Sequence, residues 1–285
     1  MISARVGRSE RGLAAVGLSG LVIALACRVA VVARGPFIEP EGKLLDAATF
    51  TFGVAVFTLT VVLLLPLAGY SDVARRRWRR SYYVFAIYGL AAEPIQAFRG
   101  LDPRFTEAGG PIDVAAGIVF GATAVVMTVV SVVLGLRFFR ADVLPERPVL
   151  RLGIRYGFTA VMLSFAIGII MSIVSGRVIG EAGDLLPAHA LGVHGIQALP
   201  AVALLGSPGT DRRASVGVHV AGAGWLAACV AMLAQALLGR PPLESSLLPM
   251  VAVAGAALWV AAGLHASRSA WGEVVRPAGR GTTRR

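Results

Sequence analysis

Long apolar stretches recur along the whole sequence, and they constrain its fold more than any other feature. An α-helix rises about 1.5 Å per residue, so about 20 apolar residues are needed to cross the core of a bilayer. Eight stretches qualify, and they cover residues 12–33, 47–69, 82–98, 114–136, 153–174, 185–206, 214–238 and 247–265. Each should be helical, because a strand in lipid would leave its backbone polar groups unpaired. The sequence therefore predicts an all-α, polytopic transmembrane helical bundle of about eight spans, forming a single domain over residues 1–285.

Composition excludes the main alternative classes. Of the residues, 56% are apolar and only 15% are charged. A soluble domain carries about 25% charged residues, and a disordered chain is poor in apolar ones. The two cysteines, Cys27 and Cys229, both lie inside apolar stretches, which disfavours a disulfide framework or a cysteine-based zinc site. The 26 arginines, one lysine and absence of asparagine indicate a GC-rich bacterial genome.

Basic residues are distributed unevenly among the segments that join the apolar stretches. If the N-terminus is cytoplasmic, 20 basic residues lie on the inner side and six on the outer side, while Arg28 falls inside the first stretch. This imbalance follows the positive-inside rule, and eight spans return the C-terminus to the cytoplasm. We therefore predict a multi-pass protein of the bacterial cytoplasmic (inner) membrane, with the lipid bilayer as its partner.

The net charge of +11 has the same explanation. The most basic run, residues 75–80, lies between two predicted spans, on the side that the charge imbalance makes cytoplasmic. A basic patch is also typical of nucleic-acid-binding proteins, but topology accounts for this one. We predict no nucleic-acid partner, and contact between this run and anionic lipid head groups.

The N-terminus has features of a signal peptide. Three arginines precede the run Leu13–Ala26, and Cys27 follows it. However, a further apolar run after Arg28 brings the stretch to spanning length. We therefore expect the first span to remain uncleaved.

No internal repeat is predicted. The tripeptide Ile95-Gln96-Ala97 recurs as Ile196-Gln197-Ala198, but in spans of opposite direction, so we treat the recurrence as chance.

Polar residues gather in one layer of the predicted bundle, its outer third. An ionisable residue inside a membrane is costly, so each one is a functional hypothesis. The layer is formed by Arg28 from the first span, by Glu93, Gln96 and Arg99 from the third, and by Asp184, His189, His194 and Gln197 from the sixth. Three further polar residues lie at similar depth, Asp113 at the start of the fourth span, Arg177 after the fifth and Gln235 near the end of the seventh. The residues of the first, third and sixth spans predict a polar pocket that opens outward between these three spans. The alternative is that they are interfacial residues whose polar ends reach the water.

The residue types in this layer suggest roles. Arg28 and Arg99 would hold an anionic group, because guanidinium pairs well with carboxylate or phosphate. Glu93 and His194 are the candidate acid and base of a catalytic step. The other four polar residues of the first, third and sixth spans would contribute to ligand binding. Pro94 breaks the hydrogen bonding of the third span, which is tolerated best where a helix lines a cavity.

Metal and haem sites are weaker alternatives. His189 and His194 lie five residues apart, or about 140° around a helix, so they do not face one way. A metal site would need one of them together with Glu93 or Asp184. His219 and His265, near the cytoplasmic ends of the last two spans, are candidate axial ligands of a haem. Single histidines at helix ends also cap carbonyl groups, and that interpretation stays open.

Two blocks of the sequence resemble a known family. One is Gln96-Ala97-Phe98-Arg99-Gly100, followed by Phe105 and Asp113. The second is a Gly-Asp loop that enters a histidine-containing helix, with Gly183, Asp184, His189, His194, Gln197, Leu199 and Pro200. Together the blocks resemble an uncharacterised family of bacterial multi-pass integral membrane proteins. The resemblance implies that the third and sixth spans belong together, and it supplies no activity. Where a Ser-His pair is expected after Gly100, this chain instead has Leu101-Asp102-Pro103-Arg104.

These observations lead to one main functional hypothesis and three alternatives. The main hypothesis is an inner-membrane protein whose outer polar pocket takes an amphiphilic or anionic ligand, with an enzymatic step left open. The first alternative is a small-molecule transporter that uses the same residues as an external gate. The others are a haem- or metal-binding redox subunit and a structural, partner-binding membrane protein. The sequence leaves the substrate, the reaction and the oligomeric state open.

Overall fold

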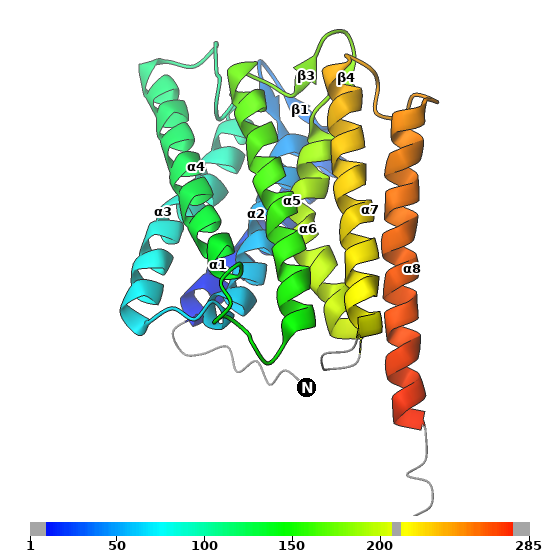
Figure 1. Cartoon of the computed structure of the whole chain (residues 1–285). Coiled ribbons are helices and arrows are strands. Elements are labelled where there is room, and N and C mark those ends of the chain that lie inside the picture. Colours follow the sequence, from blue (N-terminus) through cyan, green and yellow to red (C-terminus); the bar gives the residue numbers. More distant parts are fainter. Residues whose placement is uncertain (1–9, 207–211, 276–285) are drawn as a thin grey trace, which may run out of the picture. The chain divides into compact units, whose positions relative to one another are not determined.

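The fold is almost entirely helical. The structure is a computed structural model, and it describes residues 10–206 and 212–275. Over these residues the chain forms eight α-helices, which confirms the predicted all-α fold (Figure 1). They are α1 (Arg11–Arg34), α2 (Leu44–Leu64), α3 (Asp72–Phe98), α4 (Pro111–Arg137), α5 (Pro148–Ile173), α6 (Leu186–Leu205), α7 (Arg212–Leu237) and α8 (Leu247–Val275). Arg5, Arg8 and the four arginines after Val275, which the charge argument uses, lie outside the described residues.

Seven of the eight described helices are long and apolar enough to cross a membrane. The protein is therefore a multi-pass membrane protein with transmembrane helices. The exception is α3, because its first turns carry Asp72 and five arginines, and only residues 82–98 of it are apolar. The predicted third span over 82–98 thus stays a prediction, as do the cytoplasmic termini, the uncleaved first span and the bacterial inner membrane.

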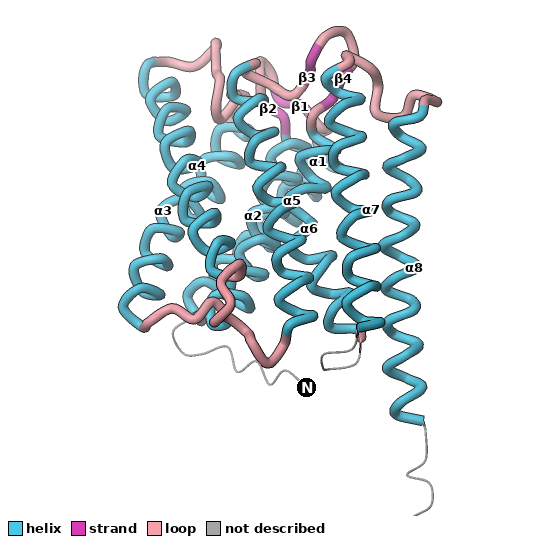
Figure 2. Tube along the Cα trace, viewed as in Figure 1, coloured by secondary structure: helices cyan, strands magenta, loops and turns pink. Residues whose placement is uncertain are grey.

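The chain divides into two compact units, Met1–Val143 (unit 1) and Leu144–Arg285 (unit 2). In each unit a two-stranded antiparallel hairpin joins the first helix to the second (Figure 2). The strands are β1 (Phe37–Ile38) and β2 (Gly42–Lys43) in unit 1, and β3 (Val178–Ile179) and β4 (Gly183–Asp184) in unit 2. We call the end of each unit that carries the hairpin its hairpin end. The prediction of a single transmembrane domain stays a prediction.

The two hairpins have the same register and share sequence. Ile38 pairs with Gly42 in one hairpin, and Ile179 pairs with Gly183 in the other. When these pairs are aligned, Ile38 and Gly42 match Ile179 and Gly183, and four further identities appear between the units, at Gly35/Gly176, Leu44/Leu185, Leu45/Leu186 and Ala47/Ala188. An equivalent backbone hydrogen bond closes each hairpin, from Leu44 N to Pro36 O at 2.9 Å and from Leu185 N to Arg177 O at 2.8 Å.

The third helix of each unit ends in the same motif, Gln-Ala-x-x-Gly. The glycines, Gly100 and Gly239, have positive φ values of 77° and 69°. The residue after each glycine donates its N–H to the glutamine carbonyl, at 2.9 Å for Gln96 and 3.2 Å for Gln235. This is the Schellman arrangement, in which a left-handed glycine closes a helix. The motif therefore sets the helix end in both units.

Hairpin and helix end are also joined in the same way. The hairpin tip donates a backbone N–H to the glycine carbonyl, from Glu41 to Gly100 at 2.8 Å and from Ala182 to Gly239 at 3.2 Å. The chain thus consists of two copies of one four-helix plan, and the prediction of no internal repeat is wrong. The tripeptide at 95–97 suggested the wrong partner, because its true counterpart ends α7 and not α6.

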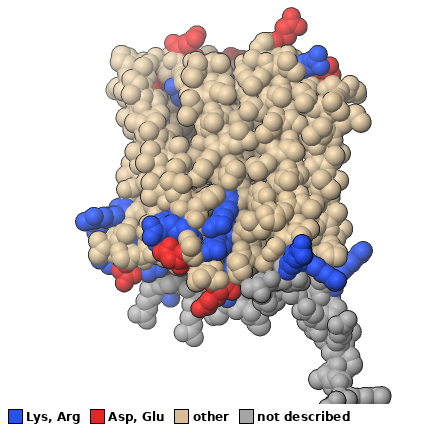
Figure 3. Space-filling view, viewed as in Figure 1, with Lys and Arg blue, Asp and Glu red and all other residues tan. Residues whose placement is uncertain are grey.

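Charged side chains lie mostly near the helix ends. On the face drawn in Figure 3, tan surface covers most of the length between the blue and red groups. Charge is excluded from the middle of a membrane protein because lipid cannot solvate it. The buried core of each unit is correspondingly apolar. In unit 1, for example, Leu44, Ala47 and Ala97 pack together beneath the hairpin.

Candidate functional site

A buried carboxylate lies near the hairpin end of unit 1. Glu93 is on α3 and only 1% of it is exposed. Its Oε2 accepts a hydrogen bond of 2.6 Å from Nη2 of Arg104, which belongs to the loop between α3 and α4. An unpaired buried carboxylate would cost several kcal/mol (~3–5). Arg104 is therefore the residue that allows Glu93 to be charged in this place.

The Arg104 guanidinium is held on two sides. Its central carbon lies 5.1 Å from the ring centre of Phe50 and 5.2 Å from that of Phe120. Cations are attracted to the faces of aromatic rings at such distances. The side chain nevertheless keeps 31% of its surface exposed. In the described part of the chain, its Nε and Nη1 donate to no protein acceptor.

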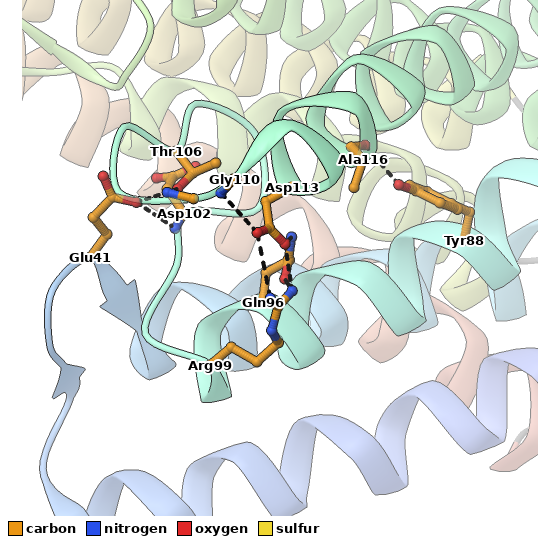
Figure 4. Close-up of polar contacts among 10 residues, drawn as sticks. Glu41, Tyr88, Gln96, Arg99, Asp102, Thr106, Gly110, Asp113 and Ala116 are labelled. Atoms are coloured by element: carbon orange, nitrogen blue, oxygen red, sulfur yellow. Dashed lines mark hydrogen bonds and ion pairs between the residues drawn. The ribbon is translucent and has the colours of Figure 1, made fainter.

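Gln96 and Arg99 come together around a residue of α4. Gln96 Nε2 donates to Asp113 Oδ1 at 3.1 Å, and Arg99 Nη1 donates to the same oxygen at 2.5 Å (Figure 4). Arg99 also donates to Gln96 Oε1 at 2.5 Å. The network ties the end of α3 to the start of α4. The charge of Arg99 is thus already balanced by Asp113, and its role in ligand binding stays a prediction.

Glu41, at the tip of the hairpin in unit 1, holds the loop that carries Arg104. Its carboxylate accepts hydrogen bonds from Thr106 Oγ1 at 2.6 Å and from the backbone N–H groups of Asp102, Glu107 and Ala108 at 3.2, 2.8 and 2.9 Å. These donors, the Thr106 hydroxyl first among them, lower the pKa of Glu41 to about 2. The pinned loop fixes the position of Arg104 over Glu93.

Because the Glu41 carboxylate holds the loop between α3 and α4, we expect the stability of that loop to depend on pH. Its pKa lies below the ordinary 4.5, so its contribution is full above pH 4.5 and is lost as the pH falls from there toward 2. We expect Glu41→Gln to speed hydrogen exchange at the amides of Asp102, Glu107 and Ala108 several-fold at pH 6. The difference from the wild type should shrink as the pH falls below 4.5.

Glu39→Gln provides the control for this experiment, because Glu39 is an exposed carboxylate of the same hairpin. It should leave exchange at the three amides unchanged. Equal effects of the two substitutions would show that Glu41 does not pin the loop.

Arg28 does not join these networks. It lies on an exposed face of α1, beside the buried Cys27, and it forms no ion pair among the described residues of unit 1. Its predicted contact with an anionic ligand stays a prediction.

Two of the predicted residues of unit 2 make local structural contacts. Asp184 Oδ1 accepts the backbone N–H of Leu186 at 2.9 Å, where α6 begins, and lies 3.8 Å from Arg177 Nε across the hairpin. His189 Nδ1 lies 3.0 Å from the carbonyl oxygen of Ser164. A carbonyl only accepts, so this contact assigns the proton to Nδ1. Ser164 Oγ in turn donates to the His189 carbonyl at 2.8 Å, and the pair clamps α5 to α6.

His194 and Gln197 lie on one turn of α6, with His194 Nδ1 3.3 Å from Gln197 Oε1. The predicted pocket would combine these residues of unit 2 with Arg28, Glu93 and Arg99 of unit 1. That joint pocket and the acid–base role of His194 stay predictions.

The metal and haem sites also stay predictions. Among the described residues, no group of three or more His, Cys, Asp or Glu side chains is placed to hold a metal ion. The two haem candidates have separate neighbours. His219 Nδ1 lies 2.9 Å from the Tyr156 hydroxyl of α5, and His265 lines a cavity beside the start of α7.

The two units share some polar residues at equivalent positions, while other polar residues occur in unit 1 alone. Gln235 takes the place of Gln96: it donates to Pro241 O at 2.9 Å and accepts from Ser246 Oγ at 3.2 Å, which ties α7 to α8. The hairpin-tip carboxylate, however, has no counterpart, because Ala182 corresponds to Glu41. Counting back from the shared glutamine, Met232 corresponds to Glu93. The carboxylates of Glu41 and Glu93 are thus found in unit 1 and not at the equivalent positions of unit 2.

Sequence reasoning left Arg104 out of these networks, as an ordinary interfacial arginine. It placed Asp113 in the polar layer, as the first residue of a span, but without its partners. Neither stands at helical spacing from its partner, so only the loop between α3 and α4 brings them there. Comparison of the chain with protein-family models, with curated proteins and with solved structures finds no match. The family resemblance of the two sequence blocks stays a prediction.

Proposed function

We propose that this multi-pass membrane protein binds the anionic head group of an amphiphilic ligand at the hairpin end of unit 1. The observation that carries the proposal is the pair formed by buried Glu93 and partly exposed Arg104. A charged pair at this depth is expensive to maintain, and such residues are functional by default. Stability alone does not call for it, because apolar residues of similar volume are usually as good or better.

The internal repeat supports the same proposal. Unit 2 keeps the hairpin, the Gln-Ala-x-x-Gly helix end and the glutamine bridge, yet it has Met232 where unit 1 has Glu93. The four-helix plan therefore folds without the buried pair. Unit 1 has in addition the Arg104 guanidinium, which the Glu93 carboxylate, two phenylalanine rings and the loop held by Glu41 keep in position.

The chemistry of this site favours a carboxylate or phosphate. Glu93 and the two phenylalanines fix the guanidinium plane, and the N–H groups not used by Glu93 remain for ligand oxygens. Guanidinium presents its donors in a planar fork that matches these anions. Phe50 and Phe120 provide apolar surface for the first methylenes of the ligand. A catalytic step by Glu93 and His194 would be a further property of such a site.

The test is a titration with matched amphiphiles. The protein in a neutral detergent is titrated with an alkyl phosphate, and separately with an alkyl phosphocholine of equal chain length, by calorimetry. We expect the alkyl phosphate to bind more tightly. Glu93→Gln should bind it as well or better, because Arg104 no longer shares its charge. Adding Arg104→Gln to that variant should weaken binding by about 10- to 100-fold.

Arg240→Gln is the matched control, since Arg240 is an exposed arginine at the hairpin end of unit 2. It should bind like the wild type. If the Glu93→Gln/Arg104→Gln variant bound as tightly as Glu93→Gln alone, Arg104 would not be the anion site.

Transport of the same ligand is a second candidate, and one observation favours it. The hydroxyl of Thr51 on α2 is fully buried, and it has no hydrogen-bond partner among residues 10–206 and 212–275. Two turns further along α2, buried Thr58 lies 2.9 Å from the buried Tyr82 hydroxyl. Polar groups thus continue into the interior of unit 1, as a transport path requires. Proteoliposomes separate the two candidates, because a transporter accumulates labelled ligand and a binding protein does not.

A further inference from the structure

A cavity lies at the opposite end of unit 2, away from its hairpin. Its volume is about 510 Å³, and it is lined by Arg212, Arg213, Val216 and Gly217 of α7 and by His265 of α8. It is separate from the site proposed above, which belongs to unit 1. The charge distribution of the sequence predicts that this end of unit 2 is cytoplasmic.

The lining combines two kinds of surface. Arg212 and Arg213 are exposed arginines in the first turn of α7, and His265 faces them from α8. The rest of the cavity wall is apolar. Further along the two helices, exposed apolar side chains follow, Val220 on α7 and Leu258 on α8. A phosphate at the arginines would therefore have room for acyl chains along the two helices.

We propose that this cavity seats the phosphate head group of an anionic membrane lipid. Basic pockets between helices on the cytoplasmic side are suited to such head groups, because the inner leaflet is rich in anionic lipids and each arginine adds attraction. The apolar continuation along α7 and α8 is what favours a lipid over a free phosphate ion. The lipid head group occupies the space above Gly217, with its charge against the two arginines.

Gly217 provides a test that changes no charge. A Cβ atom added there would meet no atom within 4 Å, so a larger side chain fits α7 but fills the cavity. Leucine also favours helix over glycine. Gly217→Leu should therefore fold and exclude the lipid.

The experiment measures lipid binding to the detergent-purified full chain by native mass spectrometry. Phosphatidylglycerol and phosphatidylcholine of the same acyl chains are titrated separately. We expect a clear preference for phosphatidylglycerol in the wild type. Arg212→Gln/Arg213→Gln should weaken its binding by about 10- to 30-fold, and Gly217→Leu by a similar factor.

Two control variants match these changes. Arg34→Gln/Arg240→Gln removes two exposed arginines at the hairpin ends of the units, away from the cavity and from the basic run 75–80. Gly121→Leu fills a helical position of α4 that also has no atom within 4 Å of an added Cβ. Both should bind phosphatidylglycerol like the wild type.

Three results would overturn the proposal. Equal losses in the two double-arginine variants would mean diffuse attraction to the basic surface. Unchanged binding by Gly217→Leu would mean that the cavity is not the seat of the lipid. Displacement of phosphatidylglycerol by millimolar inorganic phosphate would mean a soluble anion site.

Discussion

Arg104→Gln is expected to destabilise unit 1 by roughly 2–4 kcal/mol, because it leaves the Glu93 carboxylate buried and unpaired. Glu93 is 1% exposed, and Arg104 is the partner that balances its charge. The expected loss of stability is smaller than is usual for a broken buried ion pair. The Arg104 side chain is 31% exposed, so water already screens part of its interaction with Glu93. Unfolding of the protein in mixed detergent micelles by increasing fractions of SDS measures the change.

A double-mutant cycle separates this interaction from other effects of the substitution. Glu93→Gln removes the charge that Arg104 balances, so Glu93→Gln/Arg104→Gln should recover most of the stability lost in Arg104→Gln. Arg240→Gln, which changes an exposed arginine of unit 2, should alter stability by less than about 0.5 kcal/mol. A double variant no more stable than Arg104→Gln alone would show that Arg104 acts mainly by packing on Phe50 and Phe120.

Gly183→Ala is expected to destabilise unit 2 by about 3 kcal/mol or more. A Cβ atom at this strand position would lie 2.1 Å from the carbonyl oxygen of Ala236 and 2.8 Å from that of Ile179. Both are backbone atoms, so no side-chain rotation relieves the overlap. The hairpin would have to move away from the end of α7. The same SDS titration measures the loss.

The repeat supplies a second instance of the same test. Gly42 is the counterpart of Gly183, and a Cβ there would lie 2.3 Å from the carbonyl oxygen of Ala97. Gly42→Ala should therefore destabilise unit 1 to a similar degree. Gly121→Ala is the opposite control: it has free space in α4 and should stabilise the helix by about 0.5–1 kcal/mol. Tolerance of alanine at both hairpin glycines would contradict the close approach of hairpin and helix end.

Some of the candidate site follows from local sequence. Gln96 and Arg99 share a helix at a spacing of three, and they do meet, because residues three apart lie on one face of a helix. The depth of Glu93 likewise follows from its place near the end of an apolar stretch. Their partners do not follow from spacing. Asp113 and Arg104 reach them through a loop whose course is set by Glu41, a residue about 60 positions earlier in the chain.

The internal repeat illustrates the same difference. Its sequence signal consists of scattered glycines, leucines and alanines, which are common in any membrane helix. Only the paired hairpin registers and the two glycine-closed helix ends align those residues. The segment Leu101-Asp102-Pro103-Arg104, which follows Gly100, departs from the resembled family. The role of this segment is visible only in the structure. Its last residue is the partner of Glu93.

The sequence by itself determined the class of the protein. Apolar stretches of spanning length must become helices, because lipid offers the backbone no hydrogen bonds, and this requirement is local to each segment. The tertiary structure alone decided which polar side chains share a network and that the chain holds two copies of one plan. Those features depend on contacts between residues far apart in the sequence, such as Glu41 with Ala108 and Glu93 with Arg104. The energy of such contacts arises only when packing brings the partners to hydrogen-bond distance.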